Sequence, residues 1–103
     1  MAAAPSAVAS PAAVDCIQNP TPNSHTAGAF LGTDVNIRTG PFSTCTSIGE
    51  GQPSNNVTVH CRRLNSNGVF WDYLTDHTTG KTGWSIDSLV AFGPTPTPCG
   101  PDN

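Results

Sequence analysis

The stretch DVNIRTGP at positions 34–41 and the stretch GKTGW at positions 80–84 decide the fold of this chain. In the first, two apolar residues alternate with two polar ones, which is the period-two pattern of a half-buried strand, and Gly-Pro then ends it. The second follows a turn and, with the residues after it, places Trp84 and Ile86 on one face. Each stretch therefore predicts a strand, one early and one late in the domain.

The residues between the two stretches repeat the strand pattern. Apolar and polar residues alternate over 57–62, and an aromatic strand over 70–74 follows the turn at 65–68. No window has helical periodicity, although residues 87–90 fit a single 3₁₀ turn before a last short strand. Short strands separated by turn signals predict an all-β domain, a small barrel of about five to seven short antiparallel strands.

The two opening stretches resemble the motifs of the bacterial Src-homology-3 domain family. In that family an Asn-Val-Arg-Ser-Gly-Pro-like stretch forms a strand that enters a long first loop, and a Gly-Lys-Thr-Gly-Trp-Val-like stretch forms a late strand. The similarity covers residues 29–92. The resemblance implies a Src-homology-3-like barrel that binds rather than catalyses, commonly at a bacterial cell wall.

The same resemblance implies a ligand site. Family members with a known role hold their ligand in a groove near the first loop. On this chain that groove would involve Asn36, Arg38, Phe42, Tyr73 and Trp84. The implied ligand is peptidoglycan or another cell-surface peptide or glycan. The alternative function is a free-standing secreted interaction protein, such as an inhibitor or an exported ligand of another protein.

Two aromatic positions carry predictions of their own. Phe42 follows Gly-Pro in the first loop, so it is either an exposed contact residue or a lid that folds back on the core. Tyr73 and Trp84 face each other if the second hairpin turns around residues 78–79. The predicted core consists of Val35, Ile37, Val57, Val59, Trp71, Tyr73, Trp84, Ile86 and Leu89.

The composition changes at both ends of the chain. Residues 1–14 are rich in Ala, Ser and Pro and carry no charged side chain, so we expect a disordered leader that followed a removed signal peptide. Residues 15–99 form one predicted domain with its core at 29–92 and a Pro-rich end, and residues 100–103 form a tail. We expect the protein to be a monomer.

Four cysteines in a chain of 103 residues indicate disulfides and an oxidising, extracellular location. If residues 45–50 and 56–61 form a hairpin around Pro53, Cys45 lies opposite Cys61, which predicts that disulfide. The remaining pair is then Cys16–Cys99. A zinc site is disfavoured because no two cysteines are close in sequence.

Charge and residue spacing argue against several functions. The net charge is −3 with only four basic residues, so the basic surface that nucleic acid requires is missing. No stretch has the roughly 20 apolar residues of a membrane span. The three histidines lie in separate segments, and no serine lies in a nucleophile-elbow motif. We therefore expect no enzyme activity, no metal, no cofactor and no membrane insertion.

Overall fold

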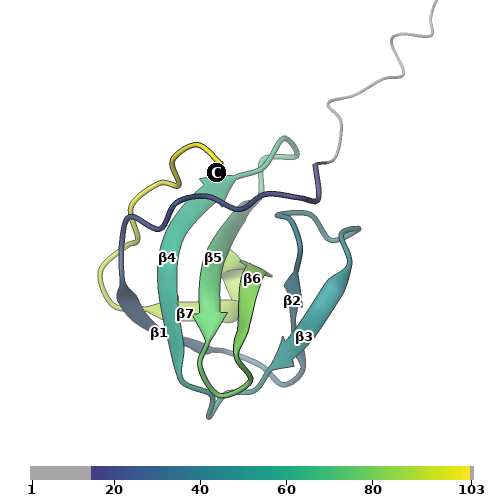
Figure 1. Ribbon diagram of the computed structural model, residues 1–103. Coiled ribbons are helices and arrows are strands. Elements are labelled where there is room, and N and C mark those ends of the chain that lie inside the picture. The colour runs from purple at the N-terminus through teal and green to yellow at the C-terminus, as the bar shows by residue number, and fades with distance from the viewer. Residues whose placement is uncertain (1–14, 103) are drawn as a thin grey trace, which may run out of the picture.

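The computed structural model describes residues 15–102, which fold into one antiparallel sheet of seven strands (Figure 1). The strands are β1 (Thr26–Phe30), β2 (Val35–Arg38), β3 (Ser47–Gly51), β4 (Val57–Leu64), β5 (Phe70–Asp76), β6 (Lys81–Ile86) and β7 (Val90–Phe92). The 3₁₀ turn η2 (Asp87–Leu89) joins β6 to β7. The all-β prediction and the predicted 3₁₀ turn are confirmed.

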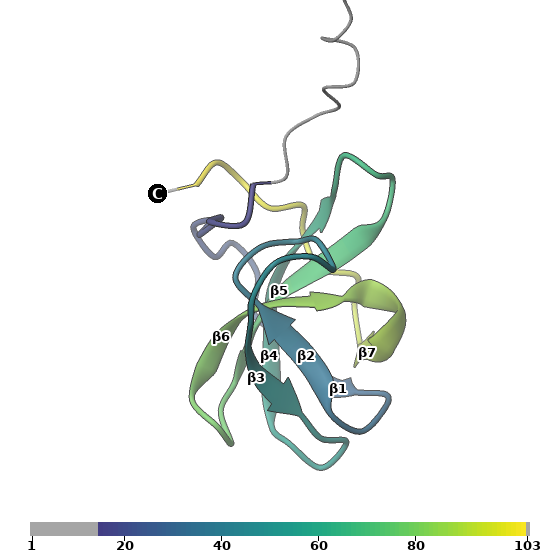
Figure 2. The same cartoon turned by 90° about the vertical axis from the view of Figure 1, so that its right-hand side faces the viewer.

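The strand order across the sheet is β3-β2-β6-β5-β4-β1-β7. The sheet is strongly curved, so that β2 and β3 lie on one side of the molecule and β1 and β7 on the other (Figures 1 and 2). The edge strands β3 and β7 do not pair with each other, so hydrogen bonds do not close the sheet into a barrel. Within residues 15–102 no helix has the length and apolar character needed to span a membrane.

The concave side of the sheet holds the main core. Its buried members come from five strands and are Phe30, Val35, Ile37, Val57, Val59, Leu74 and Val90. Gly51 on β3 makes room for Phe30, because a Cβ at position 51 would lie 2.0 Å from the Phe30 ring. The prediction that Leu89 belongs to the core is wrong, since Leu89 is 40% exposed at the end of η2.

A second buried cluster lies on the opposite side of β4, β5 and β6. Cys61 is opposite Tyr73. Tyr73 is in turn opposite Trp84, as the register of the second hairpin predicted. The Tyr73 and Trp84 rings have centroids 5.1 Å apart, and Trp71 belongs to the same cluster. Because neighbouring residues on a strand point to opposite faces, Leu74 packs in the main core and Tyr73 packs in the second cluster.

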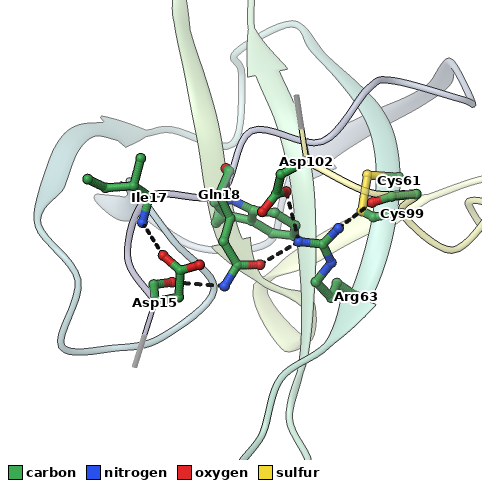
Figure 3. Close-up of polar contacts among 9 residues, drawn as sticks. Asp15, Ile17, Gln18, Cys61, Arg63, Cys99 and Asp102 are labelled. Atoms are coloured by element: carbon green, nitrogen blue, oxygen red, sulfur yellow. Dashed lines mark hydrogen bonds and ion pairs between the residues drawn. A yellow bond between two sulfur atoms is a disulfide. The ribbon is translucent and has the colours of Figure 1, made fainter. Parts of the chain in front are cut away.

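The two terminal segments cover this second cluster (Figure 1). The Trp84 indole Nε1 donates to the Gln18 carbonyl at 2.9 Å. Arg63 lies between Gln18 and Asp102 and donates to both of their side chains (Figure 3). Pro20 forms an isolated bridge with Asp102, so the two ends of the described chain are side by side.

The disulfides join Cys16 to Cys45 and Cys61 to Cys99, so the predicted pairs Cys45–Cys61 and Cys16–Cys99 are wrong. The prediction required β3 and β4 to form a hairpin around Pro53. Instead β3 pairs with β2, and β2, β6 and β5 separate it from β4. The two Cα atoms are 5.3 Å apart in the Cys16–Cys45 disulfide and 4.8 Å apart in the Cys61–Cys99 disulfide.

Each disulfide fixes a terminal segment to the sheet. Cys16 ties the N-terminal segment to the loop between β2 and β3. Cys99 ties the Pro-rich tail to β4, where the Arg62 N–H donates to the Thr97 carbonyl and the Cys99 N–H donates to the Arg62 carbonyl. The predicted disordered leader, residues 1–14, lies outside the described residues.

Candidate functional site

A concavity of about 150 Å³ lies where β2, the loop at 39–46, β5 and η2 meet. Its lining combines an apolar floor with polar side chains from β2 and the loop, and consists of Val35, Asn36, Arg38, Ser43, Trp71, Ile86 and Leu89. Strands supply most of these residues, and the disulfide at Cys45 holds the loop. The concavity is therefore a site on a rigid framework, as a binding site requires.

The polar groups of the concavity are only partly used within the protein. Arg38 is half-buried, and its Nη1 donates to the Cys45 carbonyl at 2.9 Å. The Asn36 Oδ1 accepts a hydrogen bond from the Ser47 hydroxyl at 2.9 Å. The Trp71 indole Nε1 is shielded from solvent and has no hydrogen-bond partner among residues 15–102. No acidic side chain belongs to the lining.

The structure separates the five site residues implied by the resemblance into two groups. Asn36 and Arg38 line the concavity. Trp84 is opposite Arg38 in the sheet but has no exposed surface, because Gln18 and Arg63 cover it. Tyr73 is buried beside Trp84. Both rings are thus core residues, as the predicted core had them, and the terminal segments lie over that face instead of an open groove.

Phe42 is also buried, with 5% of its surface exposed, so the exposed-contact alternative is wrong and the lid alternative holds. The loop turns tightly here, with the Cys45 N–H donating to the Phe42 carbonyl at 3.0 Å. Gly40 packs on the N-terminal segment, because a Cβ there would lie 2.6 Å from the Cys16 Cα. The Cys16–Cys45 disulfide joins the same loop to the same segment.

Sequence reasoning missed five of the seven lining residues as site residues. Four of them were assigned to the core, namely Val35, Trp71, Ile86 and Leu89, and Ser43 carried no signal. The only available signal was the position of Leu89 in a predicted 3₁₀ turn, where an apolar side chain has few strand neighbours to cover it.

A larger groove of about 410 Å³ lies between the end of the β4–β5 hairpin and the tail. Its lining is mostly apolar and consists of Arg62, Arg63, Leu64, Phe70, Thr95, Pro96, Pro98 and Cys99. Leu64 and Phe70 are exposed. The Arg62 guanidinium lies 3.7 Å above the Phe70 ring and 3.4 Å from the Asp87 carboxylate. No pattern in the sequence indicated this groove.

Asp72 on β5 is fully buried opposite Arg62 on β4 and Ser85 on β6. Among residues 15–102, no donor group gives a hydrogen bond to either carboxyl oxygen of Asp72. Burial and the neighbouring Asp87 carboxyl raise the pKa of Asp72 to about 8, and the Arg62 charge opposes that rise. The raised pKa favours the protonated form of Asp72 at neutral pH, and that form can donate a hydrogen bond to the Asp87 carboxylate.

The three histidines gather on β4 and its neighbours without forming a metal site. His25 and His60 have ring centroids 5.4 Å apart. His60 Nε2 and the Thr75 hydroxyl are 2.8 Å apart, as are His77 Nε2 and the Thr58 hydroxyl. Burial, with the His25 ring, lowers the pKa of His60. Among residues 15–102 no group of three metal-ligating side chains comes together.

Comparisons of this chain with protein families, with curated proteins and with solved structures find no match. Membership of the bacterial Src-homology-3 family therefore stays a prediction from the two sequence motifs. The concavity and the groove beside the tail are the two candidate binding surfaces.

Proposed function

We propose that the chain is a secreted, non-catalytic binding module of the bacterial Src-homology-3 type whose ligand occupies the concavity at Arg38. Its ligand is peptidoglycan or another cell-surface peptide or glycan. The observation that carries the proposal is an open concavity in which a half-buried guanidinium, in no ion pair within residues 15–102, lies beside an apolar floor. The two disulfides support an oxidising, extracellular location.

The arrangement around the concavity favours binding over catalysis. Its lining contains neither a His nor a carboxylate that could act as a general acid or base. All four cysteines are bonded to each other, so none supplies a thiolate nucleophile. Arg38 is instead fixed in direction by the Cys45 carbonyl, which suits recognition of a ligand.

The proposal is tested by sedimenting the full chain with purified cell walls. Arg38→Gln should lower the bound fraction about tenfold, because a hydrogen bond to a charged group contributes on the order of 1.5–3 kcal/mol. Lys81→Gln is the matched control, since it removes the same charge from an exposed position at the far end of β6. Equal binding of the wild type and Arg38→Gln would contradict the proposed site.

A second candidate function is a secreted interaction protein that binds another protein. The groove beside the tail favours it, because Leu64 and Phe70 are exposed apolar side chains on one wall. If no wall preparation retains the chain, and Phe70→Ser rather than Arg38→Gln weakens binding to a purified partner, this function replaces the first.

A further inference from the structure

We propose that the concavity takes the free C-terminal carboxylate of a short peptide, with the small side chain of the terminal residue packed against Ile86 and Leu89. The inference rests on the proposed function, because it names the ligand class of the same site. Three properties of the concavity support the inference: the charge of its lining, its unpaired hydrogen-bond donors and its volume.

The charge of the concavity favours an anionic group. Arg38 is the cation of the lining, and no acidic residue lines the concavity. Arg62 and Arg63 are paired with acids at 3.4 Å and 3.2 Å, whereas Arg38 makes no ion pair within residues 15–102. In a chain of net charge −3 with only four basic residues, a half-buried guanidinium left unneutralised is a position that an external carboxylate can fill.

The free polar groups of the lining are mainly donors. A guanidinium has five N–H groups, and the Cys45 carbonyl uses one Arg38 nitrogen and fixes the plane of the others. The Asn36 side-chain Oδ1 already accepts from the Ser47 hydroxyl, which leaves the side-chain N–H groups for a ligand. The Trp71 indole N–H also has no partner among the described residues, but it is shielded from solvent and is not counted among the donors open to a ligand. An acceptor-only carboxylate matches this set.

The size of the concavity restricts the rest of the ligand. A volume of about 150 Å³ corresponds to roughly five water molecules at about 30 Å³ each. That space admits a carboxylate and one small side chain. The apolar floor of Val35, Ile86 and Leu89 suits a methyl group better than a polar chain. A C-terminal alanine has both features.

The two tryptophans provide a direct measurement. The Trp84 indole N–H donates to the Gln18 carbonyl. The Trp71 indole N–H has no partner among residues 15–102, and Trp71 is one of the residues that line the concavity. We would record the two indole N–H signals of the ¹⁵N-labelled full chain, assign them with Trp71→Phe, and titrate with Ala-Ala. The free acid should shift the Trp71 signal saturably and leave the Trp84 signal in place.

The C-terminal amide of Ala-Ala is the matched ligand. It should need about a tenfold higher concentration for the same shift, because it lacks the charge that Arg38 recognises. Arg38→Gln should remove the preference for the acid, and Lys81→Gln should keep it. Equal binding of the acid and the amide, or a preference that survives Arg38→Gln, would overturn the carboxylate inference.

Failure of this inference and failure of the proposed function give different results. If cell walls retain the chain through Arg38 but neither dipeptide shifts the Trp71 signal, the carboxylate inference is wrong and the binding module stands. If the free acid binds at the concavity and no wall preparation retains the chain, the carboxylate inference is supported and the wall ligand is wrong.

Discussion

At the scale of single residues, Asp72 contributes to how stability depends on pH. Its carboxyl is buried in the folded protein, and burial raises its pKa to about 8 against 3.8 when unperturbed. Folding therefore binds a proton between these values. The resulting contribution to the unfolding free energy is full below about pH 4, declines as pH rises, and is lost above about pH 8.

Asp72→Asn should remove that decline, because an amide fills the same space and has no proton to lose. In urea unfolding, the variant should gain stability over the wild type as pH rises from 5 to 8, by on the order of 1 kcal/mol per pH unit. Glu50→Gln, the same change at an exposed site on β3, should show no such trend. A wild-type slope that persists in Asp72→Asn would contradict the role of this carboxyl.

Phe42→Ala tests the position of the loop. Since Phe42 is almost fully buried, the truncation should cost about 3–5 kcal/mol of unfolding free energy. Phe70→Ala removes the same ring from a partly exposed site and should cost about 1–2 kcal/mol, mainly through its contact with Arg62. If the two variants are equally stable, Phe42 is a surface residue.

At the scale of elements, both disulfides of the terminal segments stabilise the fold, and one of them also holds a loop of the site. Each closes a loop of 29 or 38 residues, which corresponds to about 3–4 kcal/mol in the loop-entropy model. Both Cys16→Ser/Cys45→Ser and Cys61→Ser/Cys99→Ser should therefore lower the melting midpoint. Only the first pair holds the loop that carries Ser43 and positions Arg38.

Removal of the Cys16–Cys45 disulfide should thus weaken wall binding beyond its effect on stability, when both double variants are compared at a temperature where they are folded. Removal of Cys61–Cys99 should leave binding by the folded fraction unchanged. Equal loss of binding in the two variants would mean that the loop does not depend on its disulfide.

The sequence predicted some elements well and others poorly, for physical reasons. Alternation identified β2, β4, β5 and β6, and the short turn set the Tyr73–Trp84 register. The pairing of β3 was wrong because SIGEG has two glycines and no clear alternation, so local pattern could not show that β3 pairs back to β2. Both disulfides were mispredicted from that one error.

At the scale of the whole molecule, the ends of the described chain decide which surfaces remain open. The segments around Gln18 and Asp102 cover Trp84, the residue that the family resemblance placed at a ligand. Those segments have no periodicity, so the sequence could not show that they pack on the sheet. The concavity at Arg38 and the groove beside the tail remain, and they imply different functions.

The most direct test of the central claim is a map of backbone amide shifts in the full chain as soluble peptidoglycan fragments are added. The shifted signals should gather around the concavity, at Asn36, Arg38, Ser43, Trp71 and Leu89, and Arg38→Gln should abolish them at the same fragment concentration. Shifts gathered instead at Leu64, Phe70 and Pro96, or no saturable shifts with any fragment, would contradict that claim.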